Sequence, residues 1–144
     1  MPSLQHLKIA VPETRQLDVL ANLLTKRGAQ VARCPLVSIL DHPDQAAVVN
    51  WLQQFCATPP DYFVVITGEG LQRLLDCAEK NTLYNEFVST LKHVELVVRG
   101  PKPQRVLRTL GIKAQHVGAA PTSVGVGSTL QQLPLKGKRV ALQL

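Results

Sequence analysis

The sequence predicts an α/β fold in which helices cover both faces of a parallel sheet. Residues 8–39 read as strand, helix and strand, the unit with which parallel sheets begin. Residues 62–66 form a nearly continuous apolar run, typical of a strand buried on both faces. Strands and helices then alternate at short spacing. The 144 residues are 45% apolar, which is enough to build a sizeable core.

The first predicted elements are the strand, helix and strand over 8–39. After a strand over 8–11, a helix is expected from Leu17 to about Arg27. Gly28 follows the last cations and is a typical helix stop. A second strand is expected over 31–39. The helix assignment rests on the apolar residues that fall on one face: Leu17, Leu20, Ala21, Leu23 and Leu24.

The residues that follow are predicted to continue the alternation of helices and strands. A helix begins at 42–44 and ends at Thr58-Pro59-Pro60, followed by a strand over 62–66 and a helix over 71–80. Further elements are expected as helix 87–91, strand 93–98, a short helix closing at Gly111, strand 112–117, helix 123–133 and a strand from 138. Gly125 and Gly127 weaken the helix over 123–133 by about 1 kcal/mol each relative to alanine.

The last of these strands stops at Leu144 without a turn or a cap. Lys138 to Leu142 also restates the pattern of Leu7 to Val11, as if a second βαβ unit began there. We therefore expect that the last strand is cut off and that a second βαβ unit begins there.

The charge balance favours an anionic partner without naming one. A net charge of +6 suits phosphate or carboxylate ligands, and it suits simple solubility equally well. Only 4% of residues are aromatic, so platforms for stacking nucleic-acid bases are lacking, and a nucleic-acid protein rests on the pI alone. No segment is apolar enough to predict a membrane helix, so a cytoplasmic protein is expected.

No cofactor, metal site or catalytic group can be named from the residues. Cys34, Cys56 and Cys77 form no CxxC pair, and the histidines have no metal-binding spacing. No serine lies in the glycine setting of a hydrolase nucleophile. The sequence therefore leaves the catalytic residues unknown.

Ligands of parallel α/β sheets bind at the carboxyl ends of the strands, which directs attention to the turns after them. Thr67 lies between a buried strand and a helix start, where its hydroxyl and the helix dipole favour an anion, and Gly68 allows close approach of a ligand. Thr67 could equally be only a helix cap. Arg99 and Lys102 would project from the same edge, unless they are merely solvated loop charges.

The order of these features resembles the uroporphyrinogen-III synthase family. The similarity spans the whole chain but only about the first half of a typical member, and no single motif is specific. Gly68 and Glu69-Gly70 depart from the serine and the asparagine-containing turn that the family usually has after Thr67. The matching segments are Thr14-Arg15, Gly28, Pro35-Leu36, Ile66-Thr67, Arg99-Gly100-Pro101-Lys102, Leu107-Arg108, Leu110-Gly111, Pro121-Thr122 and Gly137 to Gln143.

The resemblance implies a cytoplasmic, monomeric hydro-lyase of tetrapyrrole biosynthesis that uses no cofactor. It would cyclise the small molecule hydroxymethylbilane to uroporphyrinogen III, losing water and inverting the last pyrrole ring. Residues 1–38 would start the first lobe and 39–144 would form most of the second, so this chain alone is expected to be inactive. The implied substrate-binding residues are Thr67, Gly68, Thr14, Arg15, Arg99, Lys102, Thr122 and Ser123.

A function from another class is also compatible with the residues. The same α/β module could bind an anionic metabolite without catalysis. Glu69 favours this alternative slightly, because it adds negative charge where the synthase substrate is itself negative.

Overall fold

The structure is a computed structural model, it describes residues 3–144, and it divides between Asp41 and His42 into two compact units. The family resemblance implied a boundary three residues earlier, after Ser38. Each unit is described by itself.

The first unit is a single βαβ motif. Strands β1 (Lys8–Val11) and β2 (Gln30–Arg33) pair in parallel, with helix α1 (Leu17–Lys26) between them. The predicted helix stop at Gly28 is confirmed, because this residue has a φ of +95°. Strand β2 is shorter than predicted: the N–H of Cys34 donates to the carbonyl of Val11 at 3.1 Å, and Pro35 then has no N–H with which to continue the ladder.

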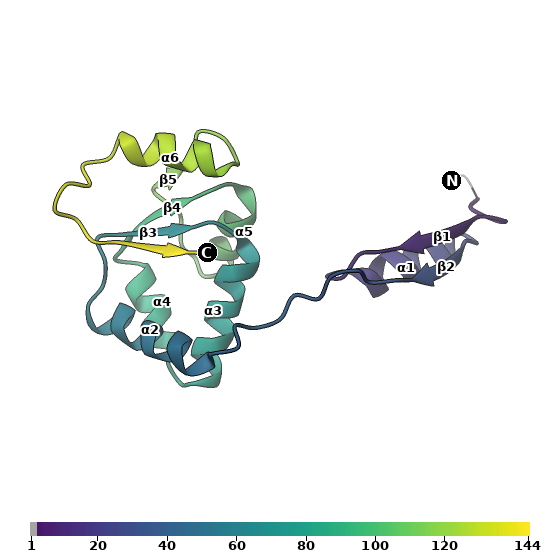
Figure 1. Cartoon of the computed structure of the whole chain (residues 1–144), viewed down its shortest axis with the longest axis horizontal. Helices are drawn as coiled ribbons and strands as arrows, with labels where there is room; N and C mark the ends of the chain where they lie inside the picture. The colour runs from purple at the N-terminus through teal and green to yellow at the C-terminus, as the bar shows by residue number, and fades with distance from the viewer. Residues whose placement is uncertain (1–2) are drawn as a thin grey trace. The chain divides into compact units, whose positions relative to one another are not determined.

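The second unit is built on a four-stranded parallel sheet in the order β5-β4-β3-β6 (Figure 1). The final predicted strand does form, and it pairs with the central strand β3. The elements of this unit are α2 (Gln45–Ala57), β3 (Tyr62–Val65), α3 (Gly68–Lys80), α4 (Tyr84–Leu91), β4 (Glu95–Val98), α5 (Pro101–Thr109), β5 (His116–Val117), α6 (Ser123–Gln131) and β6 (Val140–Gln143).

Helices lie on both faces of this sheet, as predicted. Helices α2 to α5 share one large core, in which the rings of Phe55 and Phe63 lie 5.0 Å apart and those of Phe55 and Phe87 lie 5.4 Å apart. Helix α6 covers the opposite face, where Val126 packs with Tyr62 and Val64 in a smaller cluster (Figure 1). Because successive side chains of a strand alternate between faces, the continuous apolar run of β3 serves both cores.

In the second unit α4 begins at Tyr84, earlier than the predicted 87, and two other boundaries differ for reasons that the structure shows. Helix α3 begins at Gly68 rather than 71, because Thr67 caps it. The strand predicted over 112–117 shrinks to His116–Val117. The side-chain oxygen of Gln115 accepts the N–H of Leu96 at 2.8 Å, so at that point a side chain replaces the backbone ladder.

At the amino edge of the sheet, Asp61 forms hydrogen bonds with the two residues that precede β6. Its carboxylate accepts the N–H of Arg139 at 2.8 Å and the ammonium of Lys138 at 3.2 Å. Its own N–H donates to the carbonyl of Arg139 at 2.9 Å. The hydrogen bond from the Arg139 backbone, followed by the one from Lys138, lowers the pKa of the Asp61 carboxyl.

Candidate carboxylate-binding edge of the sheet

Three helices of the second unit begin at the same edge of the sheet. Helix α3 follows β3, α5 follows β4 and α6 follows β5, and since these strands are parallel their carboxyl ends share one edge. The positive ends of three helix dipoles therefore gather there. This edge, which we call the carboxyl edge, holds six of the predicted site residues: Thr67, Gly68, Arg99, Lys102, Thr122 and Ser123.

Close backbone contacts hold the helix starts against one another. A Cβ atom on Gly68 would lie 2.8 Å from the carbonyl oxygen of Lys102, so the first residue of α3 abuts the first turn of α5. A Cβ atom on Gly100 would lie 3.3 Å from the Cβ of Pro121, just before α6. Glycine at these positions permits the approach.

Thr67 caps helix α3. Its hydroxyl oxygen accepts the N–H of Gly70 at 2.9 Å, and its own N–H donates to the side-chain oxygen of Gln143 at 3.1 Å. The Thr67 hydroxyl also lies 3.5 Å from that oxygen. The capping role proposed as the alternative is therefore present, and contact with a substrate stays a prediction.

Gln143 lies at this edge but was not among the predicted site residues, although it ends one of the segments that match the family. Its side chain is the one buried polar or charged side chain between residues 3 and 144, at 7% exposed. It lies against α3, where a Cβ atom on Gly70 would be 2.1 Å from its Nε2. The register Val65↔Gln143 between β3 and β6 brings this residue beside Thr67, and that register is a property of the folded sheet.

Charges at the carboxyl edge are mostly positive. Arg99 is half-buried directly after β4, and Lys102 is exposed in the first turn of α5. Glu69, in the first turn of α3, pairs with Arg73 at 2.9 Å. This ion pair offsets the negative charge of Glu69, which would otherwise disfavour an anionic ligand.

Helix α6 begins in the same way as α3. The hydroxyl oxygen of Thr122 accepts the N–H of Gly125 at 3.0 Å, and both Thr122 and Ser123 are exposed. A Cβ atom on Gly125 would lie 2.3 Å from the carbonyl oxygen of Ala120, so backbone packs directly on this glycine.

The two remaining predicted site residues lie in the first unit. Thr14 follows β1 and donates its hydroxyl hydrogen to the carbonyl of Val37. The carboxylate of Glu13 accepts the N–H groups of Thr14 at 2.8 Å and of Arg15 at 3.0 Å. These bonds shape the turn after β1, the position where the sequence predicted a ligand contact.

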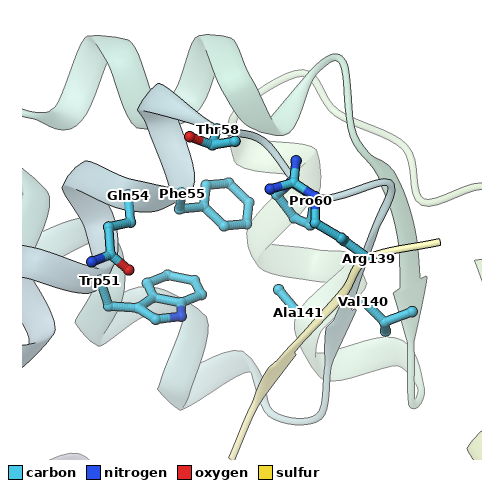
Figure 2. A pocket seen from close by; sticks show the side chains of 8 residues that line it. All are labelled: Trp51, Gln54, Phe55, Thr58, Pro60, Arg139, Val140 and Ala141. Atoms are coloured by element: carbon cyan, nitrogen blue, oxygen red, sulfur yellow. The ribbon is translucent and has the colours of Figure 1, made fainter. Parts of the chain in front are cut away.

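A hollow of about 420 Å³ lies elsewhere, beside the first half of β6 (Figure 2). It is bordered by apolar rings of α2, and the guanidinium of Arg139 is engaged by the carbonyl of Pro59. These features do not suit a substrate rich in carboxylates, so we place the candidate site at the carboxyl edge. The hollow is lined by Trp51, Gln54, Phe55, Thr58, Pro60, Arg139, Val140 and Ala141.

Residues 3–144 contain neither a metal-binding cluster nor a helix that could span a membrane. No three side chains of His, Cys, Asp or Glu come together there in a way that could hold a metal ion. None of the helices in this range has the length and apolar character needed to cross a membrane.

A parallel α/β unit with helix starts and cations gathered at its carboxyl edge is an arrangement with which proteins commonly bind anions. The model of the family described as uroporphyrinogen-III synthase HemD matches residues 18–144, and the chain belongs to this family. The family expected from the order of sequence motifs is thereby confirmed.

Three relatives show how much of a member this chain represents. "Uncharacterized protein YjjA" of Bacillus subtilis (strain 168) is 27% identical over 137 residues, which are 95% of this chain and 50% of that protein. A mutant uroporphyrinogen III synthase of Thermus thermophilus shares the fold with a TM-score of 0.70 at 23% identity, and 96% of this chain covers 52% of it. The wild-type form of that synthase has a TM-score of 0.58 at 25% identity, and the match covers 96% of this chain and 51% of the synthase. The chain thus spans about half the length of these relatives.

Proposed function

We propose that this chain provides the carboxylate-binding part of a uroporphyrinogen-III synthase, a lyase that closes hydroxymethylbilane to uroporphyrinogen III with loss of water. The observation that supports the proposal best is the meeting of three helix starts, Arg99 and Lys102 at one edge of the sheet. Family membership supplies the reaction class.

The reaction needs positioning more than it needs a strong catalytic side chain. After the hydroxyl group leaves, the electron-rich pyrrole stabilises the cation, and the outcome depends on which carbon attacks it. Holding the linear chain folded favours one attacking geometry over the open ensemble. Backbone N–H groups and separated cations suit a substrate that carries eight carboxylates.

The predicted residues have distinct roles in this proposal. Thr67 offers its hydroxyl to a carboxylate or to the departing hydroxyl group, at the start of α3. Arg99 and Lys102 attract carboxylates, while Gly68 keeps α3 close to α5. Thr122 and Ser123 contribute the start of α6, and Thr14 and Arg15 stay predicted contacts of the first unit.

The eight-carboxylate porphyrin uroporphyrin III is a suitable binding probe. We expect the chain to bind it, and we expect the Arg99→Ala/Lys102→Ala double variant to bind about tenfold more weakly, as charge-assisted contacts are lost. Fluorescence titration at fixed ionic strength measures both affinities. Equal affinity of parent and double variant would contradict the placement of the site.

We expect the isolated 144 residues to have little or no synthase activity, because they span about half of the related synthases. Chromatography of the uroporphyrinogen isomers formed from hydroxymethylbilane tests this. The expected product is the spontaneous type I isomer, and type III above that background would contradict the expectation. For the full-length protein we expect a monomer.

The alternative is a module that binds a small anionic metabolite without catalysis. The negative charge of Glu69 favoured this alternative. The ion pair between Glu69 and Arg73 makes that argument weaker. Competition distinguishes the two functions: a synthase edge should prefer uroporphyrin III to citrate or phosphate, whereas a metabolite sensor should prefer the small anion.

A further inference from the structure

We propose that Gln143 is a positioning residue that holds Thr67 for a carboxylate ligand and, by being a neutral amide, leaves room for that ligand's charge. This inference rests on the proposed function of the carboxyl edge. Gln143 is the last residue of β6, while Thr67 lies 76 positions earlier in the chain. The contact is therefore made by the sheet and not by local sequence.

The hydrogen bonds determine which way the amide faces. The Thr67 N–H is a donor at 3.1 Å and needs an oxygen opposite it, while Nε2 of Gln143 donates to the carbonyl of Leu144 at 2.7 Å. The reversed amide would place NH₂ against N–H, a donor against a donor. The oxygen of Gln143 therefore points at Thr67.

The same oxygen orients the hydroxyl of Thr67 without holding it firmly. Because the hydroxyl oxygen already accepts the N–H of Gly70 at 2.9 Å, its hydrogen must point elsewhere. The amide oxygen of Gln143 lies 3.5 Å away, at the outer limit of a hydrogen bond. A carboxylate oxygen closer than this would accept the hydrogen bond from the Thr67 hydroxyl. The backbone N–H of Thr67 would keep its hydrogen bond to Gln143.

Gly70 makes room for this arrangement. A Cβ atom at residue 70 would lie 2.1 Å from Nε2 and 2.8 Å from the side-chain oxygen of Gln143. The glycine therefore accommodates Gln143, which gives a structural reason for the Glu69-Gly70 turn.

The neutrality of Gln143 carries the functional part of the inference. A glutamate here would accept the bonds from Thr67 more strongly and would favour the helix start, although it would lose the bond that Nε2 donates to the carbonyl of Leu144. It would also place a negative charge beside the site of an anionic ligand. A purely structural role would tolerate glutamate, whereas a positioning role in a carboxylate site would not.

The matched control is Gln115 at the opposite end of the sheet. Its side-chain oxygen also accepts a backbone N–H, that of Leu96, at 2.8 Å. Leu96 is near the start of β4, away from the carboxyl edge. Gln115→Glu and Gln115→Met therefore make the same changes to an amide oxygen that accepts a backbone N–H, at an exposed position away from the site.

The test uses Gln143→Glu and Gln143→Met in this chain, with uroporphyrin III as the probe. We expect Gln143→Glu to remain folded, as shown by a cooperative thermal unfolding transition, and to bind the probe about tenfold more weakly. We expect Gln143→Met to accelerate hydrogen exchange of the Thr67 N–H about tenfold, measured by NMR, and to leave the amides of β4 unchanged. The Gln115 variants should keep the probe affinity of the parent.

Each failure has a separate meaning. Parent-like probe affinity of Gln143→Glu would overturn the positioning role, and unchanged exchange of the Thr67 N–H in Gln143→Met would overturn the contact itself. If the parent chain does not bind the probe, the proposed function of the edge is overturned. The exchange measurement still decides the Thr67 contact in that case.

Discussion

The starts of helices α3 and α6 are the same motif in two surroundings. In both, a threonine hydroxyl oxygen accepts the N–H of a glycine three residues later, at 2.9 Å after Thr67 and 3.0 Å after Thr122. Thr67 is half-buried at the central strand and is held by Gln143, whereas Thr122 is exposed. The comparison teaches that Thr-x-x-Gly specifies a cap, and that the surrounding fold decides whether the cap is also a binding position.

The two glycines of the motif differ in what faces them. Gly70 faces the end of the flexible Gln143 side chain, and Gly125 faces the backbone of Ala120. A side chain can move aside at modest cost, but the backbone of a packed turn cannot. The same substitution should therefore have different consequences at the two helix starts.

The largest effect is expected for Gly125→Ala. The new methyl group would lie 2.3 Å from the Ala120 carbonyl oxygen, and overpacking of this kind costs about 3 kcal/mol of the free energy of unfolding. Urea denaturation measures the loss. Gly127→Ala is the control in the same helix, because nothing lies within 4 Å of its Cβ position, and it should be neutral or stabilising.

Gly70→Ala should cost less stability, about 1 kcal/mol, because the amide of Gln143 can move away. Its specific effect should be local: the Thr67 N–H loses its acceptor and exchanges faster. NMR hydrogen exchange measures this. A variant as unstable as Gly125→Ala, or one with an unchanged Thr67 amide, would remove the distinction between the two glycines.

Thr67→Val and Thr122→Val form the next pair. Each removes a cap and should lower the free energy of unfolding by about 1 kcal/mol. Thr67→Val should weaken binding of uroporphyrin III more than Thr122→Val does, since only Thr67 is held by Gln143. Thermal unfolding and titration on the same samples separate the two effects, and equal probe affinities in both variants would reduce Thr67 to a cap.

The smallest effect is expected for Asp61→Asn at the other end of β6. The pKa of the Asp61 carboxyl is lowered in the folded chain by the Arg139 backbone N–H and by Lys138. Its contribution to stability is therefore present above the pKa of the unfolded carboxyl and is lost as pH falls through the lowered folded value. Chemical denaturation across this range should show the parent's advantage over the variant shrinking with acidification. A constant difference would contradict the linkage.

Most of the fold was predictable because it depends on local patterns. The apolar run of β3, the stop at Gly28 and the caps at Thr67 and Thr122 are visible within a few residues of sequence. The edge that unites the predicted turns followed from the parallel order of the strands.

What could not be predicted depends on contacts between distant residues. The bond from Thr67 to Gln143 requires the register of β6 on β3, which no local pattern contains. The strand expected over 112–117 was too long because the Gln115 side chain takes the N–H of Leu96. A polar side chain that replaces a backbone partner leaves no periodic signal.

The hydrogen bonds between Asp61 and Arg139 influence which residue lies at the far end of β6. They set the alignment Tyr62↔Val140, from which Val65↔Gln143 follows by simple counting along the two strands. A slip of one residue would bring Leu142 or Leu144 beside Thr67 and would exchange the two faces of β6. The contacts of Asp61 at the amino edge of the sheet thus determine that an amide side chain, and not a leucine, lies beside Thr67 at the opposite edge.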